Sequence, residues 1–378
     1  MDLASLEKNK EFVDDLMDKL PESCRIPTDK LSDKKYIEGA VPVQGYDFNQ
    51  GVDYDKIFEA FKTTGIQATS LGKSIDIINK MIKWRLSDEE IAEDEEDEYK
   101  DPEVRKNTKC TIFLGYTSNM ISCGMREVIR YLCQHKMVDC IVTTTGGIEE
   151  DFIKCTSKFY IGDYNLDGPD LFARGVYRIG NMMAQNAWYN DFEGLMIPLI
   201  KEMHEEQKEK GTIFTPSKII NKMGEAVNNE ESVYYWCWKN DIPVFCPAFS
   251  DGACGDNLFY YNYSNPGFIV DYVQDMSKII ELTLKSKKRG MILCGGGVSK
   301  HHICNANAFK KGADYSVYIN TGLEYDCSDT GASPSEAVTW EKININAECA
   351  KINADFSIIL PLLVSQTFAK HEKLASRV

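Results

Sequence analysis

The stretch from Tyr325 to Lys342 holds the residue types best suited to chemistry on an amine: several carboxylates, one tryptophan and a terminal lysine. The amine of Lys342 would act as a Schiff-base nucleophile if a dry, apolar pocket lowered its pKa. The indole of Trp340, two residues earlier, would form part of such a pocket or present its face to a cation. The stretch is therefore a candidate covalent amine site.

The same stretch predicts the beginning of a helix. Ser333 is suited to the N-cap, Pro334 to the first helical position, and Glu336 to the third position after the cap. Lys342 would then lie two to three turns into this helix. Taken alone, this spacing favours a capped surface helix with a solvated lysine, in which Glu336 serves the cap and Trp340 fills the core.

Other polar side chains could complete an amine site. Asp256, Asp329 and Glu336 could bind ammonium groups through charge-assisted hydrogen bonds. His301 follows a triple glycine and is a candidate general base, with a surface cap as the alternative. We expect no metal, because adjacent His301 and His302 would point about 100° apart on a helix and no metal-ligand spacing lies nearby.

From Cys110 onward, short apolar runs that end in Gly, Ser, Thr or Asp alternate with amphipathic stretches. This alternation predicts an α/β fold with a Rossmann-like parallel sheet and helices on both of its faces. The expected strands cover residues 111–116, 139–143, 243–247, 291–293 and 315–319, and the expected helices include 191–208, 216–226, 269–284 and 361–370.

Polar residues follow each expected strand. Ligands of parallel sheets bind at the carboxyl ends of the strands, so these residues should share one edge. Residues 295–297, all glycine, join a strand to a helix and would let the backbone approach a pyrophosphate. The GxGxxG pattern is incomplete, and a tight turn is an equal alternative. The edge suggests a dinucleotide site formed by residues 117–122, 144–147, 251–256, 295–297 and 321–329.

Two segments differ from this pattern. Residues 1–40 show helical spacing of Phe12, Leu16 and Leu20, and we expect an N-terminal helical arm outside one large domain at 41–378. Residues 85–106 contain the run from Asp88 to Glu103, which has eleven acidic residues and one basic residue. We expect a solvated, mobile insertion there, outside the core.

Composition narrows the class of protein. The 378 residues are 43% hydrophobic, enough for a sizeable core, and the net charge of −15 argues against nucleic acid and for a cationic substrate or basic partner. No apolar run is long enough for a bilayer, so we expect no membrane association. The 13 cysteines form no CxxC pair, and without a secretory signal they indicate reduced thiols in a cytoplasmic protein.

Five motifs stand out along the chain, which are FLGYTSN at 113–119, TTGGIEED at 144–151, DGACGD at 251–256, GGGVSKHHICNAN at 295–307 and the run from Ser328 to Lys342. In this order they resemble motifs of the deoxyhypusine synthase family. The run from Ser328 to Lys342 closely resembles the family's active-site segment, and the likeness extends over roughly residues 40–370. The match of several long motifs in order makes the resemblance specific.

The resemblance implies NAD-dependent chemistry on spermidine. NAD would accept hydride from spermidine, the aminobutyl group would move to Lys342 as an imine, and a lysine of the translation initiation factor 5A precursor would then receive it. His301 would transfer protons near the secondary amine. The implied cofactor-binding residues are Ser118, Asn119, Met120, Ile121, Ser122, Thr144, Thr145, Gly146, Glu150, Asp251, Gly296, Thr321, Gly322, Asp355 and Phe356. The implied substrate-binding residues are Glu149, Glu150, Asp256, His301, Cys327, Ser328, Asp329, Glu336, Trp340 and Lys342.

Family resemblance also implies a homotetramer, a dimer of dimers whose active sites are shared between subunits. An N-terminal helix would be able to cover a neighbour's entrance. Two alternatives stay open. A homospermidine synthase shares the fold and the imine chemistry but transfers the group to putrescine, and a regulatory paralogue would form a heterotetramer with an active partner. Retention of the nucleophile, the histidine and the carboxylates weighs against the regulatory alternative.

Three positions depart from the family pattern. Ala253 stands where relatives often have Ser, Thr145 where they often have Ala, and Cys327 where they often have Gly. Ala253 removes a hydroxyl near the cofactor, which we expect to change affinity modestly. None of the three removes the nucleophile or a carboxylate, so we expect activity to be retained.

Overall fold

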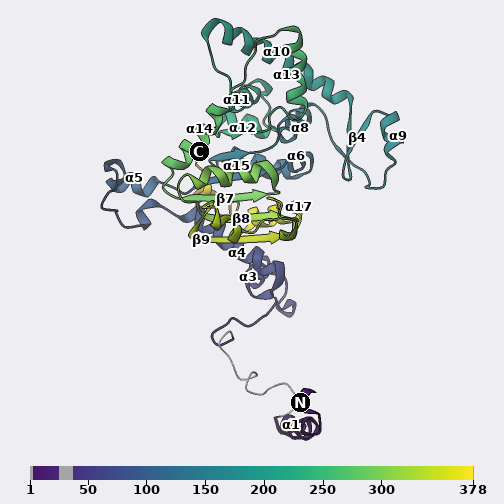
Figure 1. Cartoon of the computed structure of the whole chain (residues 1–378), viewed down its shortest axis with the longest axis vertical. Helices are drawn as coiled ribbons and strands as arrows, with labels where there is room; N and C mark the ends of the chain where they lie inside the picture. The colour runs from purple at the N-terminus through teal and green to yellow at the C-terminus, as the bar shows by residue number, and fades with distance from the viewer. Residues whose placement is uncertain (1–2, 25–36, 378) are drawn as a thin grey trace. The chain divides into compact units, whose positions relative to one another are not determined.

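The structure is a computed structural model that describes residues 3–24 and 37–377 (Figure 1). The chain divides into two compact units, residues 1–44 and residues 45–378. The first unit contains α1 (Leu3–Asp18) and η1 (Glu22–Cys24). Phe12 and Leu16 lie within α1 as the helical spacing predicts, whereas Leu20 lies beyond its end.

The second unit is built on a six-stranded parallel sheet with the order β6-β2-β1-β7-β8-β9. Figure 1 shows β7, β8 and β9 as arrows that point the same way. This sheet confirms the predicted α/β class. The strands are β1 (Thr111–Tyr116), β2 (Cys140–Val142), β6 (Val244–Phe245), β7 (Arg289–Cys294), β8 (Ala313–Asn320) and β9 (Ile343–Asn353).

Alternating side chains of the strands enter two separate cores. Ile112 and Leu114 of β1 belong to a first core, whereas Phe113 belongs to a second core on the opposite face. The first core is covered by α4 (Ile66–Lys83), α7 (Met125–Gln134), α12 (Val233–Lys239) and α17 (Phe356–Gln366). The second is covered by α14 (Val273–Lys285) and α15 (Gly297–Ala308).

The remaining elements connect or flank this sheet. They are η2 (Phe48–Gln50), α3 (Tyr54–Thr64), η3 (Leu86–Asp88), η4 (Asp97–Lys100), α5 (Pro102–Asn107), α6 (Asn119–Ser122), α8 (Thr145–Thr156), β3 (Tyr160–Ile161), α9 (Gly168–Ala173), β4 (Val176–Ile179), β5 (Met182–Gln185), α10 (Ala187–Lys210), α11 (Pro216–Val227), α13 (Ala253–Ser264), η5 (Glu324–Asp326), α16 (Pro334–Thr339) and α18 (Glu372–Ala375). Three of these strands form a second, antiparallel sheet in the order β3-β5-β4, which the sequence did not predict.

No helix of the described residues is both long and apolar enough to cross a membrane.

The prediction that Lys342 lies within a helix is wrong. The helix α16 begins as expected, with Ser333 Oγ accepting a hydrogen bond from Glu336 N–H, but it ends at Thr339. Glu341 then adopts a left-handed φ of +55°, which turns the chain, and Lys342 directly precedes β9. Its carbonyl accepts from Ala313 N–H (3.1 Å) as β8 and β9 begin to pair.

A second correction concerns the helix expected at 361–370. The helix α17 starts five residues earlier, at Phe356, because Asp355 caps it by accepting from Ser357 N–H (2.7 Å). Pro361 therefore lies inside α17 and does not begin it.

The acidic segment 85–106 also needs correction, because part of it belongs to the core. Leu86 is buried in the first core, and Arg105 is 4% exposed. The guanidinium of Arg105 donates to the carbonyl oxygens of Leu86 (2.8 Å), Glu89 (2.6 Å) and Tyr99 (3.1 Å). Lys287 at the start of β7 adds an ion pair with Glu95 (2.8 Å). The segment is thus fastened to the main unit, although most of its carboxylates are exposed.

We predict that Arg105→Ala lowers the free energy of unfolding by about 2–4 kcal/mol, because three carbonyl groups lose a donor and the Glu95 carboxylate, 3.7 Å from Arg105, keeps only Lys287. Urea unfolding would measure the loss, and limited proteolysis would show faster cleavage between residues 86 and 101. Lys106→Ala, at the exposed neighbouring position, is the matched control. Equal stability of the two variants would show that Arg105 does not anchor the segment.

Candidate active site

A cavity of about 410 Å³ lies at the carboxyl edge of the parallel sheet. It is formed where the chain leaves β1, β7 and β8. After β1 the chain adds β2 and β6 on one side of β1, and it then returns to add β7, β8 and β9 on the other side. Such a reversal is where open parallel sheets bind their ligands. The predicted cofactor residues that line the cavity are Asn119, Thr144, Gly296, Thr321, Asp355 and Phe356.

The triple glycine forms the turn from β7 into α15. Gly295 and Gly297 adopt positive φ values of +87° and +59°, and a Cβ on Gly296 would collide with the side chain of Thr330. Thr330 Oγ1 accepts a hydrogen bond from Gly297 N–H (3.1 Å), which holds the turn against the loop after β8. The turn thus presents bare backbone and the N-terminus of a twelve-residue helix to the cavity.

Other predicted cofactor residues do not present their side chains to this cavity. Met120, Ile121, Ser122 and Thr145 are buried, and the Thr145 hydroxyl donates to the Ala248 carbonyl (2.7 Å). For Met120 and Ile121, only backbone groups are left to face a ligand. Asn320 and Thr330 line the cavity but were not among the predicted cofactor residues. The strand-end rule pointed to this edge, and Asn320 is the last residue of β8.

A cluster of carboxylates lies where α8 meets α13. Glu149 Oε2 accepts from the backbone N–H of Cys254 (3.1 Å), and the negative charges of Asp251 and Asp256 act on Glu149. Burial raises the pKa of Glu149 to about 7, and the neighbouring aspartates add to this shift. Burial likewise raises the pKa of Glu150 to about 7, although the hydrogen bond that Ser122 donates to Glu150 lowers this pKa.

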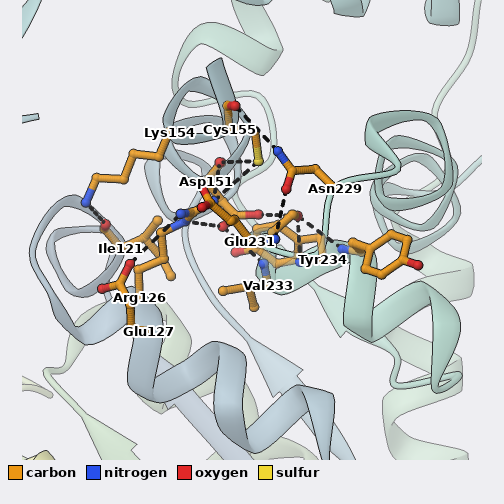
Figure 2. A network of polar contacts seen from close by, with 12 residues as sticks. Ile121, Arg126, Glu127, Asp151, Lys154, Cys155, Asn229, Glu231, Val233 and Tyr234 are labelled. Carbon is orange, nitrogen blue, oxygen red and sulfur yellow. Dashed lines mark hydrogen bonds and ion pairs between the residues drawn. The ribbon is translucent and has the colours of Figure 1, made fainter. Parts of the chain in front are cut away.

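Buried charges hold α8 in place (Figure 2). Asp151 is fully buried and accepts from Arg126 Nε (2.7 Å), Ser232 Oγ (2.5 Å) and Val233 N–H (3.1 Å). Lys154, one turn after Glu150, donates to the Ile121 and Ser122 carbonyls (2.7 and 2.5 Å) at the end of α6. The helix that carries Glu149 and Glu150 is therefore fixed to α6 and α7.

Lys342 meets His301 on the other face of the sheet. Lys342 Nζ lies 3.2 Å from His301 Nε2 and 5.7 Å from the centre of the Trp340 ring. Trp340 is 66% exposed, which excludes a role as core filler. Of the predicted substrate-binding residues, Lys342, His301 and Trp340 thus come together, and a proton can pass between the lysine and the histidine.

Two lysines support the loop that precedes α16. Lys300, which is 3% exposed, donates to the Asp329 carbonyl, and Lys351 donates to the Gly331 carbonyl. The Lys300 ammonium also lies 4.0 Å from Asp329 Oδ2. Cys327 adopts a left-handed φ of +59°, a backbone conformation that glycine adopts without strain. The loop holds Ser328 and Asp329 near the Lys342 side of the sheet, while the Glu336 side chain is exposed.

The two groups of site residues lie on opposite faces of the sheet. Ile148 and Phe152 place α8 in the first core, whereas Ile303 and Cys304 of α15 belong to the second core together with Ile343. Four strand spacings, or about 19 Å, also separate β2 from β9. The structure therefore groups Glu149, Glu150 and Asp256 in one place and Lys342, His301 and Trp340 in another, with Asp329 on the Lys342 side.

These features define a parallel α/β protein with a dinucleotide-type cavity and a lysine suited to amine chemistry. Residues 56–367 match the family model "Deoxyhypusine synthase". The chain is 50% identical to the deoxyhypusine synthase of Senecio vernalis, covering 91% of this chain and 94% of that protein, and 51% identical to that of Arabidopsis thaliana, covering 86% and 90%. The protein belongs to the deoxyhypusine synthase family, as the sequence motifs predict, which makes it an aminobutyltransferase.

Two further similarities bear on fold and branch. A crystal structure of an Entamoeba histolytica protein assigned as a deoxyhypusine synthase superposes with a TM-score of 0.61 at 35% identity, covering 86% of this chain and 97% of that one. The homospermidine synthase of Senecio vulgaris is 46% identical, covering 98% of this chain and 99% of that protein. The second similarity identifies a related branch of the family.

The raised pKa values of Glu149 and Glu150 predict a pH-dependent stability. Both groups hold a proton more tightly in the folded protein than at the ordinary value of 4.5. Their stabilising contribution is present below about pH 4.5 and is lost as the pH rises through about 7. We therefore expect Glu149→Gln/Glu150→Gln to flatten the fall in melting temperature between pH 5 and pH 8. Glu209→Gln, at an exposed position, should keep the wild-type slope, and an unchanged slope in the double variant would contradict this assignment.

Proposed function

We propose that the protein is an NAD-dependent deoxyhypusine synthase of the cytoplasm. It transfers the 4-aminobutyl group of spermidine, through an imine on Lys342, to one lysine of the translation initiation factor 5A precursor. The observation that carries this proposal is the 3.2 Å contact between Lys342 Nζ and His301 Nε2, because it places a nucleophilic amine beside a proton acceptor. Family membership supports the choice of reaction.

The residues of the rim cavity fit a dinucleotide. The Gly295–Gly297 turn offers uncovered backbone at a helix N-terminus for a pyrophosphate, since a Cβ at Gly297 would meet nothing within 4 Å, whereas Gly296 packs against Thr330. Asp355 lines the same cavity and offers carboxylate oxygen to ribose hydroxyls. When bound, NAD supplies the hydride acceptor that oxidises the secondary amine of spermidine to an imine and the hydride that reduces the final product.

The carboxylates suit a polycationic substrate. Glu149 and Glu150 ionise near neutral pH, so an ammonium group beside them favours their charged forms and releases protons on binding. Asp256 is exposed at the first turn of α13, next to this pair. The exposed face of Trp340 offers a second place where a cation can be held, beside the nucleophile.

Lys342 forms the covalent intermediate. Its uncharged Nζ attacks the imine carbon of oxidised spermidine, the bond from that carbon to the old nitrogen breaks, and 1,3-diaminopropane leaves. His301 Nε2 accepts the proton that Lys342 loses and returns a proton to the departing nitrogen. The acceptor lysine then attacks the new imine in the same way and frees Lys342.

We expect the intact mass of the factor precursor to rise by one aminobutyl group after incubation with this protein, NAD and spermidine. Lys342→Arg should abolish that gain and the borohydride-trapped adduct, because its guanidinium forms no imine, while NAD binding persists. Turnover near the wild-type rate in this variant would overturn the covalent assignment. Product formed with putrescine and not with the factor would instead favour a homospermidine synthase, the branch that the Senecio vulgaris similarity represents.

We further propose that each active site is completed by a second subunit within a homotetramer. In one chain the carboxylate cluster and Lys342 belong to opposite faces of the sheet, about 19 Å apart across the strands. A neighbouring copy can bring its own Lys342 to the carboxylates of the first copy. A heterotetramer with a paralogue is the alternative assembly.

Subunit mixing tests this arrangement. Glu149→Gln and Lys342→Ala should each be inactive, and their co-expression should restore about a quarter of wild-type activity, because half of randomly formed dimers are mixed and each has one intact site. Co-expression of His301→Ala with Lys342→Ala is the control, and it should restore nothing since both residues lie on the same side of one chain. No recovery in the first mixture would place each complete site within a single chain.

A further inference from the structure

Asn320 is a buried amide at the edge of the rim cavity. It is the last residue of β8, it is 3% exposed, and it lines the cavity together with Gly295, Gly296 and Thr330. Asn320 lies outside the sequence motifs described above, and the proposed reaction does not use its side chain. Its position beside the triple-glycine turn places it where a bound dinucleotide would come closest to the backbone.

The orientation of this amide is determined by its hydrogen bonding. Asn320 Oδ1 accepts from the backbone N–H of Gly322 (3.1 Å). An N–H group donates and cannot accept, so the oxygen must face Gly322 and the NH₂ group must point the other way.

The NH₂ group has no acceptor. The Asn320 Nδ2 atom is buried, and no group of the described residues 3–24 and 37–377 accepts a hydrogen bond from it. Buried donors are nearly always satisfied, so a donor left unpaired at the wall of a cavity indicates a missing acceptor oxygen. Asn320 lines the cavity, so a molecule bound there can supply this acceptor.

The surroundings favour an anionic oxygen. In the turn beside Asn320 the backbone is uncovered at Gly297, where a Cβ would meet nothing within 4 Å, and α15 begins there with the positive end of its dipole. Asn119 lines the same cavity, and its Oδ1 is occupied by the Thr117 hydroxyl (2.6 Å), so its NH₂ group is a second donor. Two amide donors and a helix N-terminus together match a pyrophosphate better than a sugar or a base.

We propose that the Asn320 side chain donates a hydrogen bond to the pyrophosphate of the dinucleotide bound in the rim cavity. The inference rests on the proposed NAD dependence and deepens it, since it names a residue that holds the cofactor. Asn320 thereby has two tasks, which are to shape the turn to Gly322 through Oδ1 and to bind the cofactor through Nδ2.

Asn320→Asp separates the two tasks. Aspartate keeps an oxygen for Gly322 N–H but replaces the donor by a negatively charged oxygen. We expect calorimetry on the purified full-length protein to show NAD binding weakened about ten- to a hundredfold, from a lost bond to a charged group and added repulsion. ADP-ribose, which has the pyrophosphate but no nicotinamide, should weaken equally, whereas adenosine should bind as it does to the wild type.

Two controls make the result decisive. Asn305→Asp adds the same charge at an exposed position of α15 and should bind NAD normally. Asn320→Ser, a smaller uncharged change, gives the same comparison if the aspartate variant does not fold, as judged by circular dichroism. If Asn320→Asp bound NAD with wild-type affinity, or lost affinity for NAD but not for ADP-ribose, the pyrophosphate contact would be overturned. The proposed function would not be affected by either result. No NAD binding by the wild-type protein would instead overturn the proposed function, and this inference with it.

Discussion

The parallel order of the six strands is the constraint on which the candidate site depends. Because all six point the same way, the turns after β1, β2, β6, β7 and β8 meet at one edge. The first core and the second core keep this order by taking alternate side chains from each strand, as Ile112 and Phe113 illustrate. A one-residue slip would exchange these faces, so the packing of both cores determines where the rim residues lie.

Buried charges then determine how accurately those residues are held. Asp151 is paired with Arg126 and receives two further hydrogen bonds, so its burial is compensated on all sides. Lys300 is buried and Lys154 is half-buried, and the partners of both ammonium groups are mainly backbone carbonyls. The last carbonyl groups of a short helix such as α6 have no partner within the helix, and Lys154 supplies one.

The separation of Glu149 and Glu150 from Lys342 within one chain is the reason for proposing a shared site. Within one chain the sheet lies between them, and Lys342 beside exposed Trp340 is open to water. Imine chemistry requires a site from which water is excluded. A neighbouring copy that covers this side would supply both the missing charges and the missing shelter, so stability of the oligomer and activity would change together.

The strands 111–116 and 315–319, the cap at Ser333 and part of the rim could be predicted from the sequence, because apolar periodicity, capping and strand-end polarity are local signals. The position of Lys342 before a strand could not be predicted from the sequence. The strand β9 forms by pairing with β8, and the residues that begin a helix do not determine where it ends. Motif resemblance indicated the family and the reactive residues.

Only the tertiary structure decided that Glu149 and Glu150 share a buried site, that Asn320 has an unpaired donor, and that the acidic segment is anchored. Each of these depends on groups distant in sequence, whose burial and hydrogen bonding exist only after the chain has folded.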